Sequence, residues 1–218
     1  MLTSINNKPK SPNFTARYIA NTKNIIKNVE TEIKLYELSP KHDKHFLKSF
    51  DVDLENLMPG LAKYNYERWH EMLELAKLNS LKTDRQSFLA ANNRKPCGLI
   101  AFLPGKNTFL LDCICTWPTE YGQKVNLAGT TLFQQLFKIF IGKQANKIKL
   151  EAITNGPYDT VSKYKKLGFQ PISSYYHKVL METNSNRVKQ VLKTLDKSID
   201  YTEIVNPQEG NLSNFIEI

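Results

Sequence analysis

The sequence has little of what marks secreted, metal-binding or disulfide-stabilised proteins. Its 218 residues hold only three cysteines, and neither a second cysteine pair nor a nearby histidine stands at the spacing of a zinc site. Cys97, Cys113 and Cys115 lie in apolar, strand-like stretches. We therefore expect reduced, buried thiols, no metal site and no disulfide framework.

Long apolar runs are missing as well. No uninterrupted run is long enough to span a bilayer, and the first residues, MLTSINNKPKSPNFT, lack the apolar core of a secretory signal. We expect a cytoplasmic protein without a membrane partner. A secreted effector stays open as an alternative, because some export routes need no apolar signal and the leader is rich in Asn, Ser and Lys.

Acidic residues are outnumbered by basic ones, and the net charge is +9. The excess is uneven, because residues 196–218 hold five acidic residues against one lysine. The remaining basic body attracts anions such as nucleic acid, anionic lipid or a phosphate-bearing cofactor. Charge alone does not choose among these partners.

Hydrophobic periodicity predicts an α+β protein built around one mixed sheet. Turn-forming residues at 92–94 and 104–107 indicate antiparallel connections between three consecutive strands. Residues 51–60 are expected to form an acidic loop. The expected helices cover residues 16–30, 40–50, 61–78, 127–142, 158–167 and 184–197, and the expected strands cover residues 32–38, 86–117 (three strands), 147–153 and 169–182 (two strands).

The segment CICTWPTEYGQKVNLAGTTL places a loop between a strand that ends near Thr116 and a helix that begins near Leu127. Such a junction offers free backbone N–H groups and the positive end of a helix dipole, which together favour phosphate. Ala128 and Gly129 are small enough for a pyrophosphate to approach the backbone, and Lys124 adds positive charge.

At this junction the sequence resembles the GNAT superfamily of N-acetyltransferases, whose signature is Q/R-x-x-G-x-G/A. Gln123 and Ala128 match its first and last positions, and Asn126, which also tolerates a left-handed backbone, replaces the middle glycine. The spacing between Pro118 and Gln123 is two residues longer than is usual in the family. A second match is KYKKLGF at residues 163–169, which is similar to the LYEKLGF pattern at the end of the family's next helix.

The resemblance covers residues 32–182 and implies a GNAT-like, mostly antiparallel sheet flanked by helices. Residues 1–31 would then be an N-terminal extension with a mobile leader and a short helix, and residues 183–218 a C-terminal helix with an acidic tail. The resemblance also implies acetyl-CoA as the co-substrate. The residues expected to bind it are Cys115 and Thr116 at the pantetheine arm and thioester, the pyrophosphate loop Gln123, Lys124, Val125, Asn126, Leu127, Ala128 and Gly129, and Asn155, which is displaced by two residues from the family's usual asparagine.

By the same resemblance, Tyr164 falls on the tyrosine that protonates the departing coenzyme A thiolate. Asp112 is the expected general base, because a carboxylate in an otherwise apolar strand needs a partner or a cleft. Glu120 and Glu151 are lesser candidates for this role.

We expect an N-acetyltransferase that acts by direct attack of an acceptor amine, without an acyl-enzyme. The sequence does not indicate the acceptor. The alternative is a catalytically degenerate GNAT-like binding module whose basic face binds nucleic acid or a protein partner. A homodimer stays open in either case.

Overall fold

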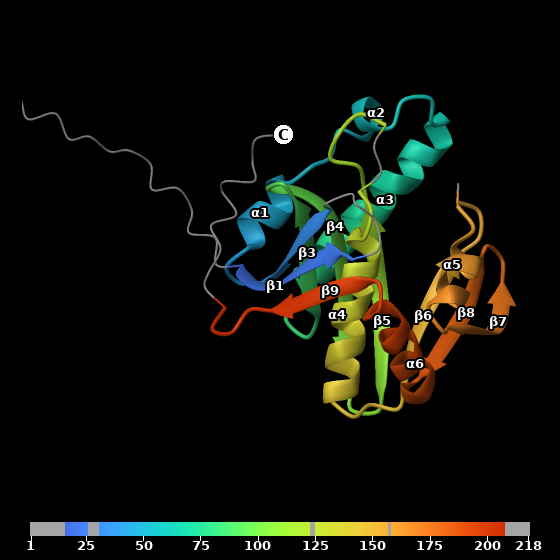
Figure 1. The fold of residues 1–218 in the computed structure, drawn as a ribbon. Helices are drawn as coiled ribbons and strands as arrows, with labels where there is room; N and C mark the ends of the chain where they lie inside the picture. Colours follow the sequence, from blue (N-terminus) through green and yellow to red (C-terminus); the bar gives the residue numbers. More distant parts are fainter. Residues whose placement is uncertain (1–15, 26–30, 123–124, 157, 208–218) are drawn as a thin grey trace, which may run out of the picture.

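The computed structural model describes residues 16–25, 31–122, 125–156 and 158–207. Within them, nine strands form one sheet in the order β7-β8-β6-β5-β4-β3-β2-β1-β9 (Figure 1). The strands are β1 (Arg17–Asn24), β2 (Glu32–Glu37), β3 (Gln86–Asn92), β4 (Lys95–Pro104), β5 (Thr108–Thr116), β6 (Lys147–Ile153), β7 (Gln170–Tyr175), β8 (Lys178–Asn184) and β9 (Ile199–Glu203). The helices are α1 (Lys44–Ser49), α2 (Leu54–Leu57), α3 (Lys63–Ser80), α4 (Ala128–Gly142), α5 (Thr160–Lys166) and α6 (Ser185–Leu195).

The predicted α+β class and the mixed, mostly antiparallel sheet are confirmed. Neighbouring strands run antiparallel throughout the described sheet except for β5 and β6, which are parallel. The expected hairpin of β3 and β4 turns at Asn93 and Arg94, whose φ angles are 48° and 67°. Two successive positive φ angles give the turn that matches the twist of a two-residue hairpin.

The helix predicted over residues 16–30 is wrong. Residues Arg17–Asn24 form β1, which pairs with β2 on one side and β9 on the other, and residues 26–30 lie outside the described part. Ala20 and Thr22 alternate into the core as strand residues do. β2 follows β1 after a short connection and β9 is distant in sequence, and pairing with both strands overrides the local helical spacing. The acidic loop also contains the short helix α2.

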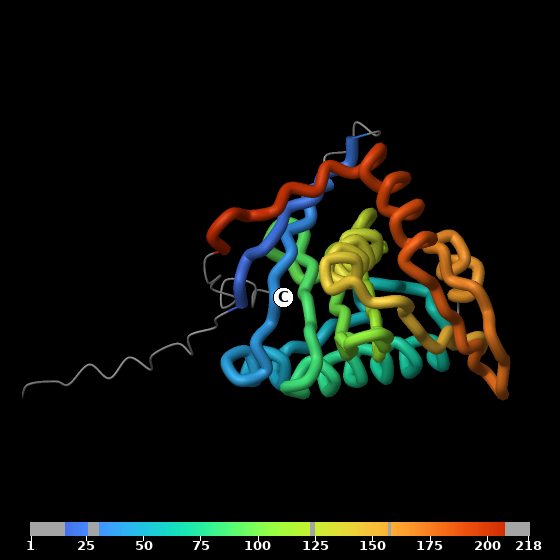
Figure 2. Tube along the Cα trace, turned by 90° about the horizontal axis from the view of Figure 1, so that it is seen from below, coloured from blue at the N-terminus to red at the C-terminus, as the bar shows by residue number. Residues whose placement is uncertain are grey.

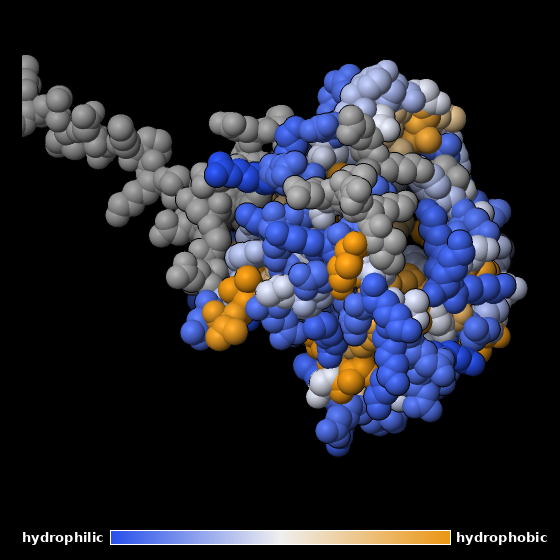
Figure 3. All heavy atoms as spheres, viewed as in Figure 1, coloured by the Kyte–Doolittle hydropathy of each residue, from blue (hydrophilic) through white to orange (hydrophobic). Residues whose placement is uncertain are grey.

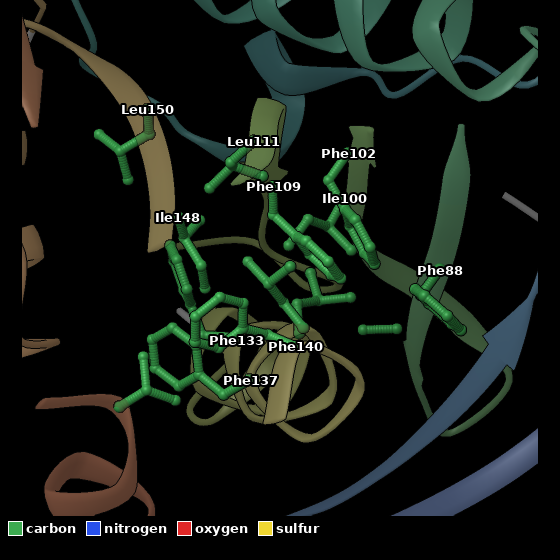
Figure 4. Close-up of a cluster of buried hydrophobic side chains, with 14 of the residues drawn as sticks. Phe88, Ile100, Phe102, Phe109, Leu111, Phe133, Phe137, Phe140, Ile148 and Leu150 are labelled. Carbon is green, nitrogen blue, oxygen red and sulfur yellow. The ribbon is translucent and has the colours of Figure 1, made fainter. Parts of the chain in front are cut away.

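The sheet is covered on both faces (Figure 2). α1 and α3 lie on one face, and α4 and α6 lie on the other, each above its own apolar core. The α4 core is rich in aromatic rings: Phe133, Phe137 and Phe140 point from the helix towards the strands (Figure 4). This packing fixes α4, which was predicted correctly over residues 127–142, against the centre of the sheet.

A β-bulge at Asp112 divides β5 into two parts. Leu111 pairs with Phe102 and Cys113 with Ala101, so Asp112 is the extra residue. The bulge reverses the direction of the side chains: Phe109 and Leu111 belong to the α4 core, whereas Cys113 and Cys115 belong to the α3 core.

Parallel pairing between β5 and β6 stops at the same place. It runs from Thr108 with Lys147 to Leu111 with Leu150 and goes no further, although β5 continues to Thr116 and β6 to Ile153. β6 stays paired with β8 along its whole length. The two strands therefore separate towards their carboxyl ends, and their backbones leave an opening in the sheet.

Candidate active site

A cavity of about 550 Å³ occupies the opening between β5 and β6. The end of β5 contributes Ile114, Cys115 and Thr116, and β6 contributes Glu151 and Ile153. The other walls come from α3, the start of α4, α5 and the loops next to these elements. They include Met58, Arg68, Trp69, Met72, Trp117, Val125, Gly129, Thr130, Phe133, Tyr158, Lys163, Tyr164 and Lys166.

The amino end of α4 faces this cavity through Gly129 and Thr130. The first helical hydrogen bond runs from the Thr131 N–H to the Leu127 carbonyl at 2.7 Å. The N–H groups of Ala128, Gly129 and Thr130 precede it and have no partner within the helix. Free N–H groups at a helix start favour anions, and the binding of a pyrophosphate at this junction stays a prediction.

Leu127 is left-handed, with a φ of 74°, whereas Asn126 is exposed and its φ is not positive. A positive φ is unfavourable for a branched side chain and marks a strained position. Val125 lines the cavity, whereas Gln123 and Lys124 lie outside the described residues.

Tyr164 lines the cavity from α5 and packs against Phe133 and Phe169, with ring centroids 5.8 Å and 6.1 Å away. Burial, and then the neighbouring Cys113 and Cys115, raise the pKa of its hydroxyl. The phenol therefore keeps its proton at neutral pH, where it can donate that proton to a stronger base but cannot act as a base itself.

The end of α5 holds Tyr164 in place. Gly168 is left-handed, with a φ of 83°. Its N–H donates to the Lys165 carbonyl at 3.0 Å, and the Phe169 N–H donates to the Tyr164 carbonyl at 3.1 Å. These two bonds, with the contact between the Phe169 and Tyr164 rings, make a Schellman motif. The glycine stop predicted from KYKKLGF is thus also the clamp on the candidate acid.

The thiols near Tyr164 are protonated. Burial raises the pKa of Cys113 to about 12 and raises that of Cys115 well above its usual value. The Cys113 thiol donates to the Met72 carbonyl at 3.4 Å. As predicted, these cysteines are free and buried, and neither has the properties of a nucleophile.

Asp112 does not line the cavity. Its carboxylate accepts from Arg85 Nε at 2.7 Å and from Arg85 Nη2 at 3.4 Å. From the sequence, a carboxylate in this apolar strand needed either a partner or a cleft. The structure gives Asp112 a partner, Arg85, at the β-bulge. Asn155 does not line the cavity either, and its amide donates to the Tyr64 hydroxyl at 3.0 Å, which joins the β6–α5 loop to α3.

Sequence reasoning gave too little weight to the polar residues on the far wall. Glu151 lines the cavity and accepts from Lys178 at 2.7 Å and from the Tyr175 hydroxyl. The alternation of KIKLEAI was the signal available in the sequence, because it puts Glu151 on the face of the strand opposite to the apolar residues. Arg68 was not singled out at all, because one arginine on a long helix resembles any solvated charge.

The face of the molecule in Figure 3 is mostly hydrophilic, and its hydrophobic patches are separate. Within the described residues, no helix is long and apolar enough to cross a membrane. No group of three or more His, Cys, Asp or Glu side chains in this part of the chain is arranged to hold a metal ion.

Comparison with known proteins finds similarity in solved structures. No family model and no curated protein sequence matches the chain. A PaiA N-acetyltransferase from Thermoplasma acidophilum in complex with coenzyme A is 18% identical, with a TM-score of 0.49 over 70% of this chain and 98% of that one. An aminoglycoside 6'-acetyltransferase type Ii is also 18% identical, with a TM-score of 0.49 over 69% and 96% of the two chains.

A GNAT family acetyltransferase from Elizabethkingia anophelis with acetyl-CoA bound is 14% identical, with a TM-score of 0.42 over 70% of this chain and 97% of that one. The solved structures found are those of acetyltransferases, the kind of protein that the sequence resembles, and the similarity is one of fold alone. They indicate no subfamily.

Proposed function

We propose that the protein is an acetyl-CoA-dependent N-acetyltransferase that transfers an acetyl group to an acceptor amine. The observation that carries the proposal is one cavity that joins the opening between β5 and β6, the amino end of α4 and the hydroxyl-bearing ring of Tyr164. These three features match the three needs of the reaction: a place for a thioester arm, an anion site and a proton donor.

The residues present suit acetyl-CoA. The unpaired N–H groups of Ala128, Gly129 and Thr130 would hold the pyrophosphate, and Lys163 and Lys166 add positive charge to the cavity wall. The end of β5 has lost its β6 partner, so the backbone at Cys115 and Thr116 would hold the pantetheine arm. Gly129 has room beside it, since an added Cβ would meet Thr116 Cγ2 at an ordinary 3.6 Å.

The chemistry is a direct displacement. The amine nitrogen bonds to the thioester carbonyl carbon, the carbon–sulfur bond breaks, and the leaving thiolate takes the proton of Tyr164. The proton that the attacking nitrogen loses as the amide forms then restores the Tyr164 hydroxyl through solvent. An acyl-enzyme is not part of the proposal, because Cys113 and Cys115 remain protonated thiols. Asp112 is left out as well, because it is bound to Arg85 away from the cavity.

Calorimetric titration with acetyl-CoA, repeated with acetyl-pantetheine, tests the cofactor assignment. We expect micromolar binding of acetyl-CoA and at least about tenfold weaker binding without the nucleotide, because the anion site would then have no ligand. Absence of acetyl-CoA binding by folded protein would refute the enzyme assignment and favour the binding-module alternative.

Tyr164→Phe tests the proton donor. The ring and its packing on Phe133 and Phe169 are retained, so we expect unchanged acetyl-CoA affinity and a kcat lower by about 10²-fold or more. The measurement is coenzyme A release with whichever primary amine an acceptor screen identifies. An unchanged kcat would remove Tyr164 from the mechanism.

A further inference from the structure

One end of the cavity has no role in the proposed cofactor contacts. It lies on the α3 side of the sheet and is lined by Met58, Trp69, Met72 and Trp117, which we call the acceptor wall. The Trp117 indole N–H donates to the Pro96 carbonyl at 2.7 Å, so this side chain gives the cavity only apolar surface. Trp69 makes an edge contact with Tyr158 at 6.3 Å, which closes the wall towards α5.

A carboxylate faces the same side. Residues 148, 150 and 152 of β6 enter the α4 core, so Glu151 and Ile153 point the other way, towards the α3 side. Among the described residues that line the cavity, Glu151 is the only acid. The Lys178 ammonium and the Tyr175 hydroxyl lower the pKa of Glu151, so it is ionised at neutral pH. Each of its oxygens keeps a lone pair for a further donor.

A fixed cation limits what else can bind there. Arg68 lines the cavity from α3. Its Nε donates to the Tyr64 hydroxyl at 3.0 Å, and its Nη1 donates to Glu71 at 2.7 Å. A second positive charge on the ligand would meet this guanidinium and the methionine and tryptophan side chains, where it would lose hydration without gaining a partner.

We propose that the acceptor is a primary amine with a single positive charge and a compact apolar or aromatic body, whose ammonium binds Glu151 and whose body packs on the acceptor wall. This inference rests on the proposed function, because it concerns the same cavity. Methionine side chains adapt to ligand shape and contact aromatic rings favourably, and a pocket of this composition suits a small apolar ligand with one polar anchor. The proton that the ammonium loses before attack goes to bulk water.

The test measures coenzyme A release at fixed acetyl-CoA with 2-phenylethylamine, tryptamine, putrescine, spermidine and kanamycin. We expect kcat/KM for the two aromatic amines to exceed that of the polycations at least tenfold. Glu151→Gln should raise the KM for 2-phenylethylamine at least tenfold and leave the Kd of acetyl-CoA within about twofold. The matched control is Glu182→Gln, the same change at an acid of β8 that pairs with Lys147 of β6 and lies outside the cavity lining. This variant should change neither constant.

Failures of the two proposals give different results. If acetyl-CoA binds but a polycation is the better acceptor, or if Glu151→Gln behaves like Glu182→Gln, the acceptor inference is overturned and the acetyltransferase assignment stands. Tighter binding of octanoyl-CoA than of acetyl-CoA would assign the acceptor wall to the acyl chain and would also overturn it. Lack of acetyl-CoA binding would remove both proposals.

Discussion

Replacing Gly168 by alanine should destabilise the protein and weaken the hold on Tyr164. A residue with a side chain pays about 1–2 kcal/mol to adopt the left-handed conformation, and the φ of Gly168 is 83°. The new Cβ would also lie 3.2 Å from Val191 Cγ2 and 3.4 Å from Arg187 Cβ, so α6 must shift slightly. Together these effects give a loss of about 2 kcal/mol.

Thermal unfolding followed by circular dichroism measures this loss. At about 2–4 °C for each kcal/mol in a chain of this size, the melting temperature should fall by about 4–8 °C. The matched control is Gly142→Ala at the end of α4, where φ is not positive and an added Cβ meets nothing within 4 Å. Alanine there should raise the free energy of unfolding by about 0.5–1 kcal/mol.

Activity provides the second measurement. The Schellman motif is built on the Tyr164 carbonyl and the Phe169 ring, so distortion at Gly168 moves the candidate acid before it unfolds the domain. We expect a lower kcat for Gly168→Ala below its melting temperature and an unchanged kcat for Gly142→Ala. Equal melting temperatures for the two variants would show that Gly168 is not left-handed and that the reasoning is wrong.

Two further predictions concern β5. Asp112→Asn removes the charge that pairs with Arg85, and both side chains are largely shielded from solvent. The free energy of unfolding measured in urea titrations should therefore drop by about 1–3 kcal/mol, with the acetyl-CoA affinity unchanged. Loss of activity without loss of stability would instead restore Asp112 as the candidate general base. All three thiols are buried, and burial raises the pKa of Cys97 and of Cys113 to about 12. None of the three should therefore react with a disulfide reagent at pH 8 until guanidinium unfolds the chain. Fast labelling of the native protein would contradict the burial of these thiols.

Local signals in the sequence were sufficient for the centre of the fold. Turn residues defined the hairpins of β3, β4 and β5, an apolar face defined α4, and Gly168 marked the end of α5. Each of these signals acts within a few residues, where backbone preferences and periodicity decide the outcome. The predicted class and sheet type followed from them.

Contacts between distant residues explain what the sequence did not reveal. Asp112 was singled out as costly, but its partner Arg85 is 27 residues away, and no local pattern links the two. Asn155 and Tyr64 are 91 residues apart. β1 shows helical spacing in isolation and becomes a strand because β2 and β9 both offer it hydrogen bonds. Such pairings depend on the assembled sheet rather than on the segment itself.

The C-terminal segment is part of the support of the candidate site rather than an appendage to it. β9 contacts α4 directly: the Tyr201 hydroxyl donates to Gln135, and Lys138 lies 4.0 Å from the centre of the Tyr201 ring. α6 packs beside Gly168 through Val191. One segment therefore restrains both the helix whose amino end would bind the pyrophosphate and the turn that clamps Tyr164. Because the proposed transfer needs both groups held within a fraction of an ångström, we propose that α6 and β9 belong to the functional unit.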